Sequence, residues 1–502
     1  MKRRDFLTAA SASVLPVLLD GFGVKAMARQ SVLVQSLLAT TALNSDRVLV
    51  IVYLNGGNDG LNTVIPIDQL SAYNGLRANI AIPQNKILTL DGNAATGLHP
   101  AMTCMRDLYN NGKLSIVHSV SYPNPDQSHY RSTDIWMTAV DANQTSNSGW
   151  AGRYLENQFP GYPAGYPNTQ MEDPLAIQIG YLTSTALLGS QQSMGIALND
   201  PNSFYQLVGS GDATSPGDVP CCDAGDLIAF IRKQQSLSVG YAAEIKRAAD
   251  AGRNLATYPD DTAKNSLADQ LKIVARLIHG GLKTKIYFVS LGGFDTHSTQ
   301  VDSSDVTKGE HGNLLGKLST AIATFQQDLK LQGLDDRVVG MTFSEFGRRA
   351  NSNNSKGTDH GVAAPMFVFG NSLKHRTIGQ NPDLANLPGQ TGSKDINMQI
   401  DFRRVYTDIL NDWFGTAQST TNNLLFREFP TVSLFSDTVE TLASGNWMDQ
   451  SKWTVGRVPF ANEYVKVNAG HTMTVNQTIT VKQLRLNGKI NFTGPYTIRM
   501  TG

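Results

Sequence analysis

The chain has 502 residues, of which 41% are hydrophobic and 17% charged, a composition typical of globular proteins. Its 42 basic and 42 acidic residues balance, so the overall charge gives no attraction to nucleic acid, and we expect no nucleic-acid partner. Three cysteines are too few for a disulfide framework, and none has the Cys-x-x-Cys spacing of a thiolate metal site.

The N-terminus has the layout of a twin-arginine signal peptide. Arg3 and Arg4 precede an uncharged stretch, Leu7–Leu19, that is too short and too rich in small residues to span a bilayer. A small-x-small site ends at Ala28. We therefore predict that residues 1–28 engage the twin-arginine export machinery and that the mature chain is periplasmic, or secreted and at the cell surface, without a membrane span.

Five apolar runs rich in β-branched residues predict strands that are buried on both faces. They are Arg47–Leu54, Lys113–Val120, Leu175–Ile179, Lys285–Leu291 and Arg337–Phe343. Apolar residues spaced three and four apart predict helices between them, at Asp226–Leu255, Ala263–His279 and Asn313–Leu331. This alternation predicts an α/β fold over residues 29–430, with a doubly wound, mostly parallel sheet whose ligand site lies beyond the carboxyl ends of the strands.

The pattern changes near residue 430, where the helical periodicity is lost. Short runs of alternating apolar and polar residues predict strands at Tyr464–Val467, Thr472–Val475, Ile479–Val481 and Leu484–Leu486. We therefore predict a small C-terminal all-β module over residues 440–502, which lacks a clear closing strand. Trp447 and Trp453 stand at its beginning, and we expect them to cap its core rather than to bind sugar.

Histidines beside acidic residues gather in loops rich in Gly, Asp, Ser or Asn. They are His99, His129, His297, His311 and His360. Imidazole and carboxylate groups both bind divalent cations at neutral pH, so such loops suit metal or proton chemistry. The sharpest positions are Asp295 with His297, Glu345, and Asp359 with His360. Taken singly, each pair is equally well explained by a local turn or capping hydrogen bond.

Many motifs, in order, resemble the domain of unknown function 1501 family over roughly residues 1–420. Besides the leader they are Tyr53-Leu54-Asn55-Gly56-Gly57-Asn58-Asp59-Gly60-Leu61-Asn62-Thr63, Leu98-His99-Pro100, Gln127-Ser128-His129, Asp134-Ile135-Trp136, Gly293-Phe294-Asp295-Thr296-His297, Phe343-Ser344-Glu345-Phe346-Gly347-Arg348 and Gly357-Thr358-Asp359-His360-Gly361. That family is itself similar to the alkaline phosphatase and sulfatase superfamily. Its members bind one or two metals at the strand ends of a doubly wound sheet.

The wider resemblance implies a divalent metal ion, either zinc, calcium or magnesium. Its expected ligands are Asp59, Asp295, His297, Glu345, Asp359 and His360. The superfamily has Ser-Asp-His-Gly where this chain has Ser344-Glu345-Phe346-Gly347, so Phe346 replaces a metal-binding histidine. This difference implies that one of the two metal sites is weakened or lost.

The candidate catalytic residues are Ser128, His129 and Arg348. Ser128 is the expected nucleophile, because a neighbouring His129 or metal ion lowers the cost of removing its proton. The alternative is that Ser128 caps a helix at Tyr130–Ala139. Arg348, and with it Arg131, has the geometry to hold an anionic oxygen, although a structural ion pair explains either arginine as well.

Two functions follow from these observations. The first is an exported metal-dependent hydrolase of phosphate or sulfate esters, whose substrate is a small-molecule or glycan ester. The alternative is a non-catalytic envelope or surface protein that uses the same scaffold and β tail to bind glycan or a protein partner. The first requires that the acidic and imidazole groups of four distant segments converge at one edge of the sheet.

Overall fold

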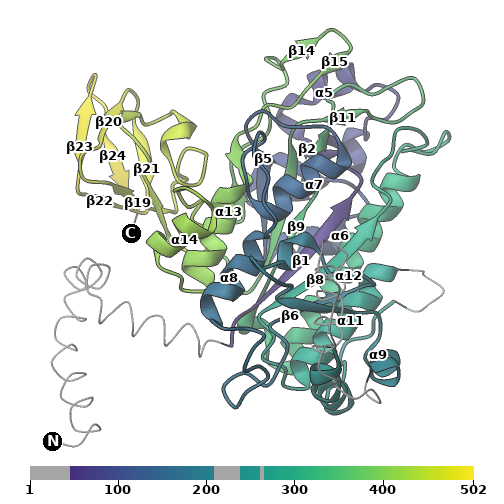
Figure 1. The fold of residues 1–502 in the computed structure, drawn as a ribbon. Coiled ribbons are helices and arrows are strands. Elements are labelled where there is room, and N and C mark those ends of the chain that lie inside the picture. The colour runs from purple at the N-terminus through teal and green to yellow at the C-terminus, as the bar shows by residue number, and fades with distance from the viewer. Residues whose placement is uncertain (1–45, 209–237, 260–264, 502) are drawn as a thin grey trace, which may run out of the picture.

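The structure, a computed structural model, describes residues 46–208, 238–259 and 265–501 (Figure 1). The predicted signal peptide, residues 1–28, and the first part of the predicted helix at 226–255 lie outside the described residues. Within that predicted helix, residues 238–251 are helical.

A nine-stranded sheet forms the centre of the fold. Its strands are β1 (Val48–Asn55), β5 (Leu114–Ser121), β6 (Ala176–Ile179), β7 (Gly195–Leu198), β8 (Ile286–Gly292), β9 (Val338–Phe343), β12 (Ala364–Gly370), β13 (Thr377–Ile378) and β16 (Ile400–Asp401). The order is β13-β5-β12-β9-β1-β8-β6-β7, and β16 also pairs with β5. Every pair is parallel except those of β12, which runs antiparallel to β5 and β9. The predicted mostly parallel α/β sheet is thus confirmed, and its five predicted strands are β1, β5, β6, β8 and β9.

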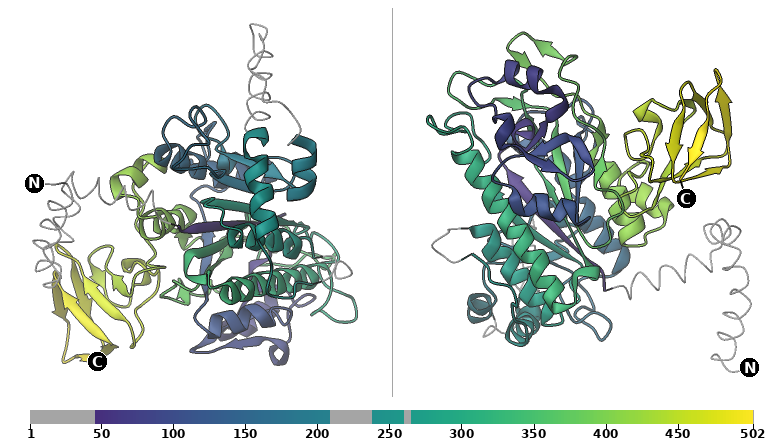
Figure 2. Two further views of the ribbon diagram at one scale, coloured as in Figure 1. Left: turned by 90° about the horizontal axis from the view of Figure 1, so that it is seen from below. Right: turned by 180° about the vertical axis from the view of Figure 1, so that it is seen from behind.

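Helices cover both faces of this sheet (Figures 1 and 2). One face carries α6 (Thr103–Asn110), α11 (Ser266–His279) and α12 (Glu310–Gln332), and the other carries α7 (His129–Thr138), α8 (Trp150–Gln158) and α13 (Phe402–Asp408). The remaining helices are α4 (Gly60–Thr63), α5 (Leu70–Leu76), α9 (Pro201–Val208) and α14 (Gln418–Leu424). Among the described residues no helix is both long enough and apolar enough to cross a membrane.

Small sheets lie at the margins of the central one. They are formed by β2 (Val64–Pro66), β3 (Leu88–Leu90) and β4 (Asn93–Leu98), by β10 (Gly347–Arg348) and β11 (His360–Gly361), and by β14 (Gly389–Gln390) and β15 (Ser393–Lys394). The β10–β11 pair stands next to the site described below.

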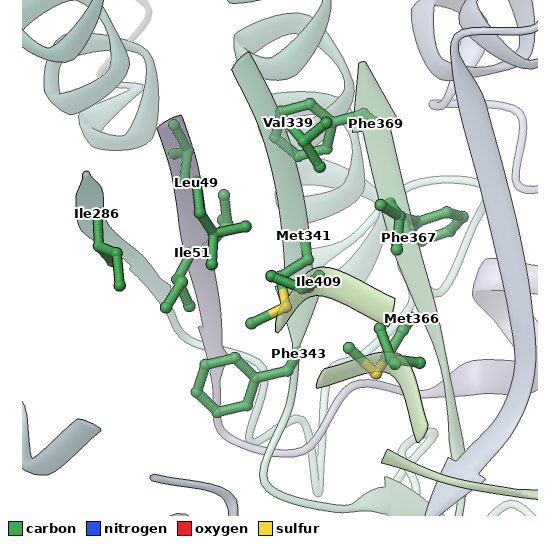
Figure 3. Close-up of a cluster of buried hydrophobic side chains, with 14 of the residues drawn as sticks. Leu49, Ile51, Ile286, Val339, Met341, Phe343, Met366, Phe367, Phe369 and Ile409 are labelled. Carbon is green, nitrogen blue, oxygen red and sulfur yellow. The ribbon is translucent and has the colours of Figure 1, made fainter. Parts of the chain in front are cut away.

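Buried apolar side chains on the central strands anchor the sheet between its helices. Figure 3 shows Leu49 and Ile51 of β1, Met341 of β9 and Ile409 in one cluster of buried side chains. Each of these side chains is at most 1% exposed. Burial of a side chain of this size stabilises the fold by about 1.5–3 kcal/mol, so continuous apolar strands fix the sheet at the middle of the molecule.

The C-terminal region forms three further small sheets. Its strands are β17 (Thr438–Glu440), β18 (Gly445–Asn446), β19 (Tyr464–Val467), β20 (Thr472–Val475), β21 (Ile479–Val481), β22 (Gln483–Leu486), β23 (Lys489–Phe492) and β24 (Ile498–Met500). Its four predicted strands are confirmed as β19, β20, β21 and β22. Trp447 and Trp453 are buried with ring centroids 4.7 Å apart, as expected for core residues.

A buried ion pair joins this region to the edge of the central sheet. The Glu463 carboxylate accepts hydrogen bonds from Arg457 Nη1 at 2.9 Å and lies 2.8 Å from His375 Nδ1. Arg457 Nε also donates to the carbonyl of Thr377 in β13, at 2.9 Å. The apolar cluster runs without a break from the central sheet into the C-terminal strands. The β region is therefore docked on the sheet rather than standing apart from it.

We expect the Glu463→Gln variant to lose about 3 kcal/mol of unfolding free energy at pH 7, because it leaves the buried Arg457 charge without its partner. Burial raises the pKa of Glu463, but Arg457 and His375 outweigh it and lower the value from 4.5 to about 2. A depressed folded-state pKa means that this stabilisation is present above pH 4.5 and is lost as the pH falls toward 2. Urea unfolding of both proteins between pH 2 and pH 7 measures the difference.

The matched control is Glu440→Gln, which removes the partly exposed pair of Glu440 with Lys466 at 3.0 Å. This change is expected to alter the unfolding free energy by less than about 1 kcal/mol. Equal effects of the two substitutions would contradict a stabilising role for the Glu463 pair.

Candidate metal centre

Segments from four parts of the chain meet at the carboxyl edge of the parallel strands. Asp295 follows β8, Glu345 follows β9, and His129 begins α7 in the connection after β5. Because β12 is antiparallel, its beginning lies at the same edge, and His360 in β11 directly precedes it. The expected convergence of acidic and imidazole groups is therefore present for these four residues.

The side chains approach one another closely around Asp295. Asp295 Oδ1 lies 3.2 Å from His360 Nε2 and 3.1 Å from His297 Nε2, and Asp295 Oδ2 lies 3.5 Å from His129 Nε2. His297 Nε2 and His360 Nε2 are 3.0 Å apart. Ligand atoms of His129, Asp295 and His360 all lie within 4.8 Å of one another.

Each of the three histidines has an oxygen acceptor at its other ring nitrogen. His129 Nδ1 lies 2.8 Å from Glu345 Oε1, His360 Nδ1 lies 2.8 Å from the carbonyl of Gln127, and His297 Nδ1 lies 3.4 Å from Asp359 Oδ1. Because a carbonyl or carboxylate accepts only, each Nδ1 must donate. In the neutral rings the Nε2 lone pairs then face the Asp295 carboxylate. A cation between these acceptors would relieve their repulsion, as it does for metal-binding histidines held by an outer shell of acceptors.

The donor set fits zinc. Zinc bonds of about 2.0–2.1 Å in a tetrahedron separate the ligand atoms by about 3.3–3.4 Å. Asp295 Oδ1 lies 3.2 Å from His360 Nε2, and the other carboxylate oxygen, Oδ2, lies 3.5 Å from His129 Nε2. Two imidazoles and a carboxylate suit zinc better than calcium or magnesium, which take oxygen ligands. Three protein ligands would leave a fourth position open, as in catalytic zinc sites.

Charges near the cluster favour the protonation states that a metal requires. Burial raises the pKa of Asp295, but the Arg348 guanidinium and the nearby histidines outweigh it and lower the value to about 2. Burial also lowers the pKa of His360, and the positive charge of Arg348 adds to this effect. At neutral pH the carboxylate is therefore ionised and the His360 imidazole neutral.

Arg348 is a buried structural residue. Its Nε donates to the carbonyl of Gly57 at 2.7 Å, Nη1 to that of Thr358 at 2.8 Å, and Nη2 to Asp295 Oδ1 at 2.5 Å and to the carbonyl of Phe294 at 3.2 Å. The side chain is inaccessible to solvent. The expectation that Arg348 holds an anionic oxygen of a ligand does not fit this position, because its donors already bind the protein.

Asp59 also lies apart from the cluster. Both of its carboxylate oxygens accept from Arg77, at 2.9 Å and 2.8 Å, and Gln300 donates to Oδ2 at 2.6 Å. Burial raises the pKa of Asp59, but Arg77 and His311 lower it below the usual value. The residue expected as the first metal ligand is thus one half of a fully buried ion pair. No sequence motif marked Arg77, whose role depends on a fold-level contact.

Three further residues named in the sequence analysis, Glu345, Ser128 and Arg131, have different surroundings. Glu345 is buried, accepts from the backbone N–H of Gly56 at 2.9 Å and lies 2.8 Å from His129 Nδ1, so it orients the His129 imidazole. Ser128 is the exposed N-cap of α7, and its side chain makes no capping hydrogen bond. Arg131 pairs with Asp134, as the structural alternative predicted.

Phe346, which replaces the expected histidine, packs directly against the site. Its ring centroid lies 4.4 Å from that of His360 and 4.9 Å from that of His129. A Cβ added at Gly57 would lie 2.4 Å from the Phe346 ring, so there is no spare volume on that side. His99 and His311 are buried elsewhere, and burial lowers their pKa values to about 3 and about 4, which keeps both neutral.

Residues 230–425 match the model of a family described as a protein of unknown function, DUF1501. This match confirms the resemblance to that family over the segment that contains Asp295, His297, Glu345 and His360. No curated protein matches the chain.

The solved structures that resemble this chain include members of the alkaline phosphatase and sulfatase superfamily. A superfamily protein from Vibrio parahaemolyticus has 10% sequence identity and a TM-score of 0.31. The match covers 67% of this chain and 63% of the Vibrio chain, which is less than two thirds of it. The PsFucS1 sulfatase from a Pseudoalteromonas species has 10% identity and a TM-score of 0.31 over 80% of this chain and 74% of its own. The lipoteichoic acid synthase LtaP from Listeria monocytogenes has 11% sequence identity and a TM-score of 0.29, and the match covers 66% of this chain and 68% of the LtaP chain. Similarities this low carry no activity over to this chain.

A pair of substitutions tests the structural assignment of Asp59. We expect Arg77→Met to lower the unfolding free energy by about 3–5 kcal/mol, because it leaves an uncompensated buried carboxylate, and we expect adding Asp59→Asn to recover part of the loss. Urea unfolding measures both effects. Because Asp59→Asn keeps an oxygen that can accept from Gln300, the double variant, where folded, is expected to keep zinc with at most a weakened affinity. Complete loss of zinc from folded protein would instead make Asp59 a ligand.

Proposed function

We propose that this chain is an exported metal-dependent hydrolase of phosphate or sulfate esters, with one zinc ion held by His129, Asp295 and His360. The observation that supports it most directly is the orientation of the imidazoles. Acceptors at Nδ1 direct the Nε2 lone pairs of His129 and His360 toward the Asp295 carboxylate. When bound, the ion supplies a Lewis acid that polarises an ester oxygen.

His297 and Asp359 are suited to proton transfer beside this centre. His297 is the more exposed of the two histidines next to Asp295 Oδ1, with 45% of its side chain accessible, against 23% for His360. Asp359 Oδ1 at 3.4 Å from His297 Nδ1 fixes the imidazole so that Nε2 faces the centre. With Nδ1 donating to Asp359, the imidazolium form of His297 carries its second proton on Nε2; it gives this proton to a leaving oxygen and becomes the neutral ring. We therefore assign His297, expected above as a ligand, as the general acid.

Ser128 is the proposed nucleophile, and the beginning of α7 is the proposed anion-binding element. Ser128 lies at the exposed N-cap, one residue before the ligand His129. The first turn of a helix presents backbone N–H groups without helical partners and the positive end of its dipole, which together bind anionic oxygens. The beginning of α7 would thus bind the anionic oxygen of the substrate, because the donors of Arg348 already bind protein acceptors.

The alternative of a non-catalytic glycan-binding protein would need a sugar-binding surface other than the two tryptophans of the β tail. Trp447 and Trp453 are at most 1% exposed and so present no face to a sugar ring. The export proposal rests on residues 1–28 and is tested by cleavage after Ala28 when the chain is produced in its native host.

Zinc binding is the first test of this proposal. The purified full chain is expected to retain about one zinc per molecule through dialysis, and His360→Ala and Asp295→Asn are expected to lose it. Glu345→Gln should keep the ligands but weaken zinc binding by about 10–100-fold, because the acceptor that orients His129 is altered. Elemental analysis and competition with a chromogenic chelator give these values. A chain matured in its native host that holds no metal would overturn the proposal.

Activity separates the ligands from the proton donor. We expect hydrolysis of p-nitrophenyl phosphate or p-nitrophenyl sulfate by the zinc-loaded chain, and a loss of about 10²–10⁴-fold in kcat for His297→Ala with zinc content unchanged. Ser128→Ala should likewise keep zinc and lose turnover. Loss of zinc from His297→Ala would make His297 a fourth ligand, and an unaltered rate in Ser128→Ala would leave water as the nucleophile.

A further inference from the structure

The side-chain amide of Asn353, in the segment between β10 and β11, makes four hydrogen bonds. Its Nδ2 donates to the carbonyl of His297 at 2.9 Å and to Asp359 Oδ1 at 3.2 Å. Its Oδ1 accepts from the backbone N–H groups of Ser355 at 3.0 Å and Gly357 at 3.1 Å. An amide offers two donors and two acceptor positions, so all of them are used and only one orientation of the group satisfies these partners.

The backbone around Asn353 packs closely against the segment that carries His297. The N–H of Gln300 donates to the carbonyl of Lys356 at 3.1 Å. A Cβ added at Gly357 would lie 2.3 Å from the carbonyl of His297, so only glycine allows this approach. The two segments therefore form one packed unit, which holds the Asn353 amide at a fixed distance from His297.

The two side chains that meet beside Asn353 are both exposed. The side chain of His297 is 45% and that of Asp359 49% accessible, and His297 Nδ1 lies 3.4 Å from Asp359 Oδ1. A contact between two such side chains is held weakly on its own, because water competes for both groups and ordering them costs entropy. Asn353 donates to the same oxygen, Asp359 Oδ1, that faces His297 Nδ1. The amide therefore fixes the acceptor to which the His297 ring donates.

We propose that Asn353 is a positioning residue that orients the His297 imidazole through Asp359. With Asp359 Oδ1 held in place, His297 keeps a proton on Nδ1, and its Nε2 faces Asp295 Oδ1 at 3.1 Å. None of the four side-chain hydrogen bonds of Asn353 goes to one of the proposed zinc ligands, so its effect passes through the His297 ring. The use of the Nε2 proton in hydrolysis rests on the proposed function, whereas the orientation of the ring does not.

Two substitutions separate the two halves of the Asn353 amide. Asn353→Asp keeps an oxygen for the N–H groups of Ser355 and Gly357 but removes the donor to Asp359, and Asn353→Ala removes both halves. On the ester that the unaltered chain hydrolyses, both zinc-loaded variants are expected to lose about tenfold or more in kcat, with KM and zinc content unchanged, because the lost hydrogen bond orients the proton donor only. Recovery of kcat in Asn353→Asp would limit the amide to shaping its own turn and overturns the proposal.

The tautomer of His297 gives a reading that needs no turnover. Ring-nitrogen chemical shifts of isotope-labelled histidine are measured on the zinc-loaded full chain in alkaline buffer, where imidazole rings are neutral, and His297→Ala assigns the signals by their loss. The unaltered chain is expected to show the Nδ1–H form alone, and both Asn353 variants a mixture with the Nε2–H form. Unchanged signals in the variants overturn the proposal even where esters are hydrolysed. A mixture in a chain that hydrolyses no ester supports the positioning role and refutes the hydrolase function instead.

Two controls complete the test. In a His297→Ala chain, Asn353→Asp is expected to cause no further loss of kcat, because its effect passes through the missing ring. A further loss of about tenfold there would reveal another route to the site and overturns the proposal. Asn351→Ala is the matched substitution in the same segment, since the Asn351 side chain accepts from the backbone N–H of Lys394 at 2.8 Å. It is expected to change neither kcat nor the tautomer; effects equal to those of Asn353→Ala would assign them to the segment as a whole and likewise overturn the proposal.

Discussion

The contact of Arg348 with Asp295 is the interaction on which the site depends. The guanidinium also binds the carbonyls of Gly57, Phe294 and Thr358, so a single side chain connects the segments that follow β1 and β8 with the one that leads into β11. A buried guanidinium needs all of its donors paired, because an unpaired one carries the full desolvation penalty. Backbone carbonyls accept from most of the Arg348 donors, and Asp295 Oδ1 accepts from Nη2. The other carboxylate oxygen, Asp295 Oδ2, is the one that faces His129.

The buried Asp59–Arg77 pair supports the same segments through Gln300. Gln300 donates to Asp59, and its carbonyl oxygen accepts from Thr296 at 3.1 Å and from Thr358 at 2.8 Å. These two threonines lie next to His297 and Asp359. The Asp59–Arg77 pair thus acts on the site through Gln300 and holds the His297 and His360 segments together. Asp295 thus lies among the imidazoles of the site, whereas Asp59 positions the segments that carry two of them.

The central strands could be predicted from sequence because a continuous apolar run is a local signal. The position of the site followed from a topological rule, that parallel strands deliver their following loops to one edge. The roles of individual residues did not follow, because they depend on partners far away in the chain. Asp59 and Asp295 both lie in glycine-rich loops, so their sequences look alike. Only the fold shows that Asp59 pairs with Arg77, whereas three histidines surround Asp295. Local alternation gave the strands β19 to β22 but not their parallel stacking, which rests on a repeat of 17 to 19 residues in the register.

Phe346 places an apolar ring directly beside the His129 and His360 imidazoles. Its ring packs against both His129 and His360 and fills the space over Gly57, where a second ion would need polar donors. An apolar ring in contact with two imidazoles also restricts their rotation, so it complements the acceptors at their Nδ1 atoms. Phe346, where the superfamily pattern has a histidine, would therefore leave room for one ion in the proposed function. Its close packing restricts the same two rings that the hydrogen bonds at Nδ1 orient.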